Sequence, residues 1–234
     1  MLDMAMKQDA VYDLLLSNLV SGSYRCGQSI LVKEVVAETG ASKQPIMSAL
    51  RQLQAEGFVR ITAQVGCHVV ALEAAEMGDF FLMFSRMEAT MAELAAQRGR
   101  EGEADRLALI NAQIRRLPRR DASSGERYRL LNREFHGALH AMSRSPRLHE
   151  QLRSSWAMSD FLISQANEFS RHISEAADEH DEVVEAVRLR NGPAARRAME
   201  AHILEFRMKV LDALASRERG REIDNPMMQE GRSN

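Results

Sequence analysis

Two histidines lie at equal distances from a predicted turn between two helices. His180 and His202 are each eleven residues from Asn191, which is followed by Gly192 and Pro193. Glycine favours the position just past a helix end, and proline favours the first turn of the next helix. A chain that folds back here places both histidines at the same height on antiparallel helices, whose axes lie about 8–10 Å apart. The two imidazoles are therefore predicted to lie close enough to share one metal ion.

A second pair of possible ligands lies upstream. Asn132 and His136 are four residues apart, so on a helix they share one face. Three imidazoles and one side-chain oxygen suit a borderline divalent ion such as Zn²⁺, Ni²⁺ or Mn²⁺. His140 is a rival, because it lies four residues after His136 and can form a two-histidine pair with it. Each histidine also has the simpler interpretation of an ordinary helix residue. The candidate metal ligands are Asn132, His136, His180 and His202.

The chain from residue 77 onward has a helical pattern almost throughout. Apolar spacing and turn residues predict helices over 77–98, 103–117, 126–143, 172–190 and 194–215, with one helix or two within 146–169. Strand patterns are absent here, so we expect a bundle of six or seven helices over residues 72–215. Residues 216–234 are polar and are predicted to form a flexible tail.

The first 71 residues are predicted to combine helices with short strands. Helices are predicted over 7–21, 30–39 and 43–56, followed by short strands over 58–62 and 67–71. This order is typical of a winged helix-turn-helix, whose second helix enters the major groove of DNA. The fold class is therefore mainly α, with a winged helix-turn-helix domain before the helical bundle. The side chains that can contact DNA are Ser42, Lys43, Gln44, Met47 and Arg51 on the third helix, and His68 in the wing.

Composition limits the classes of protein that remain. The net charge is −2, and residues 1–71 hold six basic and six acidic residues, so a small helical domain that binds protein instead of DNA stays open. The two cysteines are too few for a disulfide framework. No apolar run approaches the roughly 18 residues of a membrane span, and the N-terminus lacks a signal pattern. We expect a cytoplasmic protein.

The absence of known catalytic sequence patterns argues against an enzyme. The His-Glu-x-x-His pattern of zinc proteases is absent from the chain. Di-iron bundles place a glutamate three residues before a histidine, and the histidines here are preceded at that distance by Arg133, Gly137, Ala177 and Met199. The alternatives to a DNA-binding regulator are therefore a helical metalloprotein, or an interaction module whose DNA-binding domain has degenerated.

The first domain has a scaffold of small, turn-forming and apolar residues at fixed spacings: Gly22, Gly27, Gly40, Ser42, Pro45, Ala49-Leu50, Leu53, Glu56-Gly57 and Gly66. In these residues it resembles the N-terminal domain of GntR-family transcription regulators. The family usually has arginine and threonine where Lys43 and Gln44 stand, and a base-contacting arginine where Met47 stands; Lys33 matches another position that often contacts DNA. Loss of that arginine removes a bidentate reader of guanine, so the resemblance implies an atypical operator.

The predicted bundle contains the stretches Arg86-Met87-Glu88, Asn132-Arg133-Glu134-Phe135-His136-Gly137-Ala138-Leu139, Glu179-His180 and Ala201-His202-Ile203. In these stretches it resembles the ligand domain of the FCD class of the same family. Many members hold a metal with an aspartate or asparagine and three histidines, which by position are Asn132, His136, His180 and His202. An arginine at the position of Arg86 often pairs with a ligand carboxylate; the plainer alternative is an ion pair with Glu88 or Asp79. The resemblance implies a dimeric repressor of metabolic genes that binds a double-stranded DNA operator and responds to a small carboxylate.

Overall fold

The computed structural model describes residues 2–118, 124–166 and 173–224 of the chain. Contacts between residues divide the chain into two compact units. We call Met1–Glu73 with Gln151–Gln165 the winged-helix unit, and Ala74–Glu150 with Ala166–Asn234 the bundle unit. One helix, α7 (Pro146–Ala166), contributes residues to both units. The mainly helical fold with one small sheet confirms the predicted fold class.

The winged-helix unit is built around the predicted three helices. These are α1 (Leu2–Val20), α2 (Val32–Thr39) and α3 (Lys43–Ala55). Helix α1 packs on α3 through a fully buried apolar layer that includes Leu15, Leu19, Ile46, Leu50 and Leu53. Burial of such side chains is the main favourable contribution to a small domain of this kind. The exposed face of α3 is therefore left to its polar residues.

The sheet of this unit contains one strand that the sequence pattern did not predict. The two expected strands form an antiparallel hairpin of β2 (Val59–Thr62) and β3 (Gly66–Val69). A third strand, β1 (Ser29–Ile30), pairs with the other edge of β3, giving the order β1-β3-β2. The prediction of a helix from residue 30 was therefore wrong at its start, because Ile30 is buried in the sheet opposite Cys67 and α2 begins only at Val32.

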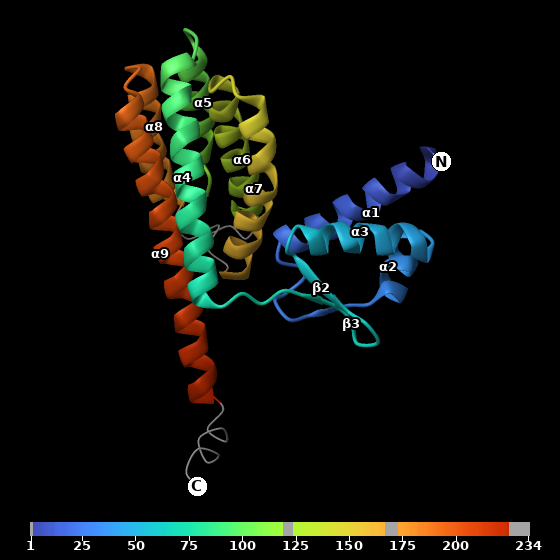
Figure 1. Ribbon diagram of the computed structural model, residues 1–234. Coiled ribbons are helices and arrows are strands. Elements are labelled where there is room, and N and C mark those ends of the chain that lie inside the picture. The colour runs from blue at the N-terminus through green and yellow to red at the C-terminus, as the bar shows by residue number, and fades with distance from the viewer. Residues whose placement is uncertain (1, 119–123, 167–172, 225–234) are drawn as a thin grey trace. The chain divides into compact units, whose positions relative to one another are not determined.

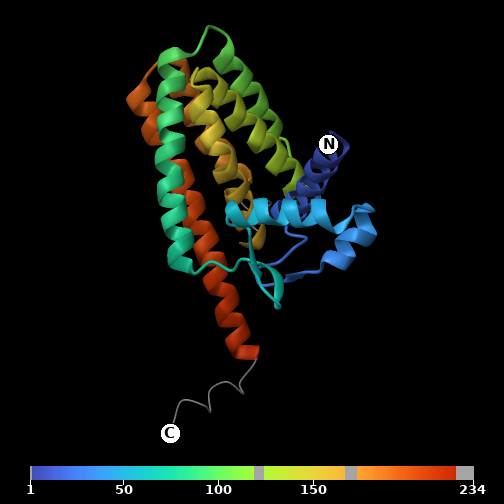
Figure 2. The same cartoon turned by 45° about the vertical axis from the view of Figure 1, so that its right-hand side comes forward.

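The bundle unit is formed by long helices that pack side by side. Besides the start of α7 it contains α4 (Ala74–Arg98), α5 (Glu103–Arg115), α6 (Ser124–Met142), α8 (Ile173–Arg188) and α9 (Gly192–Asp224). Helix α4 runs along α9, and α8 packs on both α9 and α5 (Figure 1). Helix α6 packs on α4 and α5, which closes the bundle. The side-by-side course of α4 and α9 is visible again in the rotated view of Figure 2.

Helical spacing explains which residues of the bundle are inside. The buried residues of α8 recur every three or four positions and are Ile173, Ala176, Ala177, His180, Val183, Val184, Ala186 and Val187. The same spacing buries Met199, His202 and Phe206 on α9. Both histidines thus occupy positions that an apolar core residue normally fills.

The turn between α8 and α9 lies where it was predicted, but its residues have other roles than those expected. Arg190, with φ +53°, adopts the left-handed conformation after α8. Gly192 instead begins α9, where an added Cβ would come within 3.3 Å of Glu93 Cγ on α4. Asn191 caps α9 by accepting a hydrogen bond from the backbone N–H of Ala194 at 3.1 Å. The small size of glycine therefore suits the tight packing here, and its backbone freedom is not used.

Two other predictions about the helices are refined. Residues 146–166 form one continuous helix, and residues 167–169 of the predicted segment lie outside the described residues. Helix α9 continues to Asp224, so residues 216–224 are helical although the sequence pattern placed them in a flexible tail; residues 225–234 lie outside the described residues. Within the described ranges, no helix is both long and apolar enough to cross a bilayer.

Candidate metal centre and nucleic-acid interface

Three of the predicted metal ligands meet in the centre of the bundle. His136 of α6, His180 of α8 and His202 of α9 each offer a ligand atom, and these atoms lie within 4.8 Å of one another. The ring centroids of His180 and His202 are 4.6 Å apart, and that of His136 is 5.4 Å from His180 and 5.5 Å from His202. All three side chains are buried. The hairpin argument for His180 and His202 is consistent with this close approach.

Asn132, the fourth predicted ligand, has a buried oxygen without a hydrogen bond. It lies one helical turn before His136 on α6 and is 6% exposed. Within the described part of the chain, neither its Oδ1 atom nor the Nε2 atom of His180 has a hydrogen-bond partner. Buried polar atoms nearly always have partners, so such atoms call for a ligand or water.

Each of the three histidines is held through its Nδ1 atom by an oxygen. Nδ1 of His136 lies 2.8 Å from Glu88 Oε2, and Nδ1 of His202 lies 2.6 Å from Glu179 Oε2. Nδ1 of His180 lies 3.2 Å from Asn111 Oδ1. When Nδ1–H donates to an oxygen, Nε2 carries the lone pair that binds a metal. Outer hydrogen bonds of this kind commonly orient histidine ligands in metal proteins.

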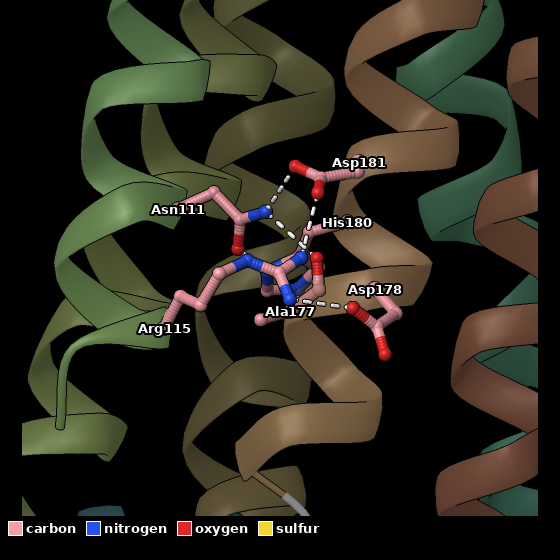
Figure 3. Close-up of polar contacts among 6 residues, drawn as sticks. All are labelled: Asn111, Arg115, Ala177, Asp178, His180 and Asp181. Carbon is pink, nitrogen blue, oxygen red and sulfur yellow. Dashed lines mark hydrogen bonds and ion pairs between the residues drawn. The ribbon is translucent and has the colours of Figure 1, made fainter. Parts of the chain in front are cut away.

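The orientation of the Asn111 amide is itself determined by its neighbours. Its Nδ2 donates to the backbone carbonyl of Ala177 at 2.8 Å and to Asp181 Oδ1 at 2.7 Å (Figure 3). Asp181 and Asp178 also accept hydrogen bonds of 2.6 Å from Arg115. Because Nδ2 faces two acceptors, Oδ1 must face His180, and the His180 ring must donate from Nδ1. The ring also stacks on Phe135, with centroids 4.0 Å apart.

Burial favours the neutral, metal-binding form of two of these imidazoles, those of His136 and His180. Burial lowers the pKa of His136 to about 4, even though its hydrogen bond to Glu88 acts in the opposite direction. Burial also lowers the pKa of His180 well below its usual value, and the neighbouring His202 and His136 add to this effect. Burial acts to raise the pKa of Glu88, but the electrostatic effect of the neighbouring His140 and hydrogen bonds from His136 and His140 outweigh it, and the pKa of this carboxyl lies well below its usual range.

The donor set fits a divalent transition metal. Three imidazoles in the metal-binding tautomer, with the amide oxygen of Asn132 one turn away, match the nitrogen-rich sites that Zn²⁺ and Ni²⁺ prefer. The buried Asn132 oxygen and His180 Nε2 lack other partners among the described residues. The residues present therefore fit the group that the sequence predicts.

Sequence reasoning missed the role of Glu88. On α4, Glu88 is fully buried, whereas its neighbour Met87 is only partly covered. Glu88 Oε1 also lies 2.8 Å from Nε2 of His140, the predicted rival ligand. Together Glu88, His136 and His140 form a second group with metal-ligand spacing, which shares His136 with the first. The sequence held one signal of this role: Glu88 is an acidic residue on the side of α4 that carries buried apolar residues.

Arg86 lies away from this cluster. Its side chain is 59% exposed and forms an ion pair with Glu200 at 3.0 Å, between α4 and α9. The plainer alternative of an ion pair is what the structure shows, although the partner is Glu200 and not Glu88 or Asp79. The contact of Arg86 with an effector carboxylate, which the resemblance implies, stays a prediction.

The residues predicted to contact DNA lie on an accessible face of the winged-helix unit. Ser42, Lys43, Gln44 and Arg51 are exposed on or just before α3, and Met47 is partly covered. Lys33 is exposed on α2. None of the basic side chains Lys33, Lys43 and Arg51 forms an ion pair with a described residue, so they remain able to neutralise phosphate.

The wing residue His68 is also held in place. It is partly covered on β3, and its Nδ1 lies 3.1 Å from Ser29 Oγ on the neighbouring strand β1. The unpredicted strand thus contributes directly to the position of a predicted DNA-contacting residue.

We expect replacement of Asn111 to weaken metal binding without removing a ligand. Asn111→Ala deletes the acceptor that orients His180, and loss of such an outer contact typically lowers metal affinity by about 10–100-fold. The measurement is a Zn²⁺ competition titration against a chromophoric chelator. Arg115→Ala is the matched control, because it removes the ion pairs with Asp178 and Asp181 but keeps the bond to His180. Equal affinities for Asn111→Ala and the unmodified protein would contradict this role.

A winged helix joined to a helical bundle with a buried histidine cluster defines a class of protein, the DNA-binding regulator with a ligand-sensing domain. Sequence models of two families match the chain: "Bacterial regulatory proteins, gntR family" over residues 7–69 and "FCD domain" over residues 79–205. The second match alone covers more than half of the chain. The chain belongs to the GntR family of transcriptional regulators and carries an FCD domain.

Individual relatives agree with this assignment. The "Nta operon transcriptional regulator" of Aminobacter aminovorans is 30% identical over 58% of this chain and 63% of that protein, which is less than two thirds of its length. The "HTH-type transcriptional repressor GlaR" of Escherichia coli is 27% identical over 82% of this chain and 90% of the relative. The solved structure of E. coli McbR/YncC has the same fold, with a TM-score of 0.71 and 15% identity over 89% of this chain and 98% of that one.

Proposed function

We propose that this regulator is a metal-dependent, ligand-responsive repressor of metabolic genes. Residues 1–71 bind the operator, and residues 72–215 bind the effector and form the homodimer. The observation that carries the proposal is the meeting of three buried, Nδ1-anchored histidines in the bundle of a chain that also presents an exposed α3. The relative named as a repressor supports the sign of regulation.

Asn132, His136, His180 and His202 would hold the metal. When bound, a divalent ion supplies positive charge and open coordination positions at which a small carboxylate can bind. The residues of this chain do the rest: Glu88, Asn111 and Glu179 orient the three rings, and the surrounding apolar core excludes water. A protein that holds its effector in this way needs no catalytic group.

The DNA-binding half of the proposal rests on α3. Its exposed N-terminal residues Lys43 and Gln44 are placed as base-reading or phosphate-contacting residues are in a helix-turn-helix. Because the unit carries little net charge, binding depends on these few side chains instead of a general basic surface. A two-fold dimer would read a palindromic operator.

The proposal is tested by operator binding in the presence of carboxylates. A duplex selected from a random pool by the purified protein serves as the operator, and acetate, succinate and citrate serve as probes at fixed salt. We expect at least one to change the operator Kd of the Zn²⁺-loaded protein by about tenfold, a usual size for allosteric coupling. The His136→Ala/His202→Ala variant is expected to show no such change. Failure to select any duplex, or tight carboxylate binding without a change in operator Kd, would overturn the proposal.

A further inference from the structure

Glu88 joins the candidate metal centre to a second histidine pair. This carboxylate is fully buried, and its two oxygens accept hydrogen bonds from different histidines. Oε2 lies 2.8 Å from Nδ1 of His136, and Oε1 lies 2.8 Å from Nε2 of His140. A shift of the His136 ring therefore acts on His140 through a single rigid group.

The chain of hydrogen bonds continues from His140 to the start of α7. His140 is only 2% exposed, and its remaining nitrogen, Nδ1, is hydrogen-bonded to Nδ1 of His149 at 3.3 Å. His149 is exposed and lies in the first turn of α7. Three hydrogen bonds thus lead from a candidate metal ligand inside the bundle to a surface residue on another helix. Such buried polar networks rigidify the groups that they join.

Helix α7 itself belongs to both units. Residues 146–150 are part of the bundle unit, and Gln151–Gln165 are part of the winged-helix unit. Within the winged-helix unit, Phe161 packs edge-on against Phe58, with ring centroids 5.9 Å apart. Gln165 accepts a hydrogen bond from the backbone N–H of Cys26 at 3.0 Å and donates one to the carbonyl of Tyr24 at 3.0 Å.

These contacts give α7 two attached ends. Its first turn is bonded to the network that begins at His136, and its last turns are bonded to the loop that precedes β1 and packed beside β2. Coupling between distant sites is carried by hydrogen-bond networks and rigid secondary structure that both sites can bias. An uninterrupted helix is such an element.

We propose that Glu88, His140 and His149 are positioning residues that couple the state of the histidine site to the winged-helix unit through α7. The inference rests on the proposed function, because it concerns how a change at His136 alters operator binding. It assigns a role to His140 and His149 that metal binding at the first cluster does not require. None of the three residues touches DNA in this proposal.

The test compares three substitutions on the surface turn. His149→Ala removes the last hydrogen bond of the network, His149→Asn keeps an amide that can replace it, and Arg147→Ala is a control at an exposed position of the same turn. For each protein, the operator Kd is measured after stripping with a chelator and after reloading with Zn²⁺, and the zinc content is determined. Hydrogen exchange of the α7 backbone is followed in the same two states.

We expect the unmodified protein and Arg147→Ala to show a Zn²⁺-dependent change in operator Kd of about tenfold. His149→Ala should bind zinc normally, and without metal it should bind the operator as the unmodified protein does. On loading with Zn²⁺, however, its operator Kd should change much less than that of the unmodified protein. His149→Asn should recover the Zn²⁺-dependent change. Zinc should slow hydrogen exchange in the first turn of α7 only where the response is present. An unchanged response in His149→Ala would overturn this inference alone. An unmodified protein whose operator Kd ignores Zn²⁺ would overturn the proposed function, and the inference with it.

Discussion

Replacing His180 with alanine is expected to reduce the zinc content of the purified protein from about one ion per chain to near zero. The substitution removes one of three imidazoles, and Asn132 offers only a neutral amide oxygen in compensation. The loss of affinity should exceed the roughly 100-fold upper range expected for the outer residue Asn111. Elemental analysis of the untagged protein, with a Zn²⁺ competition titration, measures both quantities.

The controls separate loss of a ligand from loss of the fold. His180 is fully buried and stacks on Phe135, so alanine leaves a cavity at this position. His180→Phe retains an aromatic ring without a ligand atom and should lose zinc as completely while remaining folded by circular dichroism. His68→Ala removes a histidine from the wing and should retain zinc. Stoichiometric zinc in both His180 variants would contradict the assignment of this cluster.

Replacing Gln44 with alanine is expected to weaken operator binding and to relax specificity at one base pair. Gln44 is exposed in the first turn of α3, where a glutamine can form two hydrogen bonds to adenine in the major groove. Loss of such a pair costs about 1–3 kcal/mol of discrimination. Binding of the variant to duplexes that differ at each position measures both the affinity and the position affected.

Gln52→Ala is the matched control for this experiment. Gln52 has the same side chain and is also exposed on α3, but it lies two turns further along and is hydrogen-bonded to Glu56 at 3.2 Å. It should leave the base preference unchanged. An equal effect of both substitutions, or a uniform loss across all sequences with Gln44→Ala, would show that Gln44 contacts phosphate or nothing, and not a base.

The histidine cluster illustrates how much of a site spacing alone can predict. Asn132 and His136 share a helix face by their separation, and His180 and His202 face each other because a short turn lies halfway between them. Both arguments depend only on local geometry and on one short connection, which leave little freedom for error. The choice between His140 and Asn132 as partner of His136 was not settled by spacing, since both lie four residues from it.

The residues that hold the histidines were not predictable in the same way. Glu88, Asn111 and Glu179 are 48, 69 and 23 residues away from the rings that they contact. Their roles depend on which helices become neighbours and on the rotation of each helix about its axis. The strand β1 was missed for a similar reason, because two residues have no detectable period and are defined only by pairing with β3.

Hydrophobic periodicity, turn residues and short connections act locally, so they were enough to predict the helices, the wing hairpin, the helical bundle and the four candidate ligands. The burial of Glu88, the ion pair of Arg86 with Glu200, and the network that His140 and His149 extend to α7 arise only when the helices pack together. These contacts depend on the packing of helices that are distant in sequence. They also depend on how each helix is rotated about its own axis, since turning α4 by one residue would bring Met87 instead of Glu88 to the buried face.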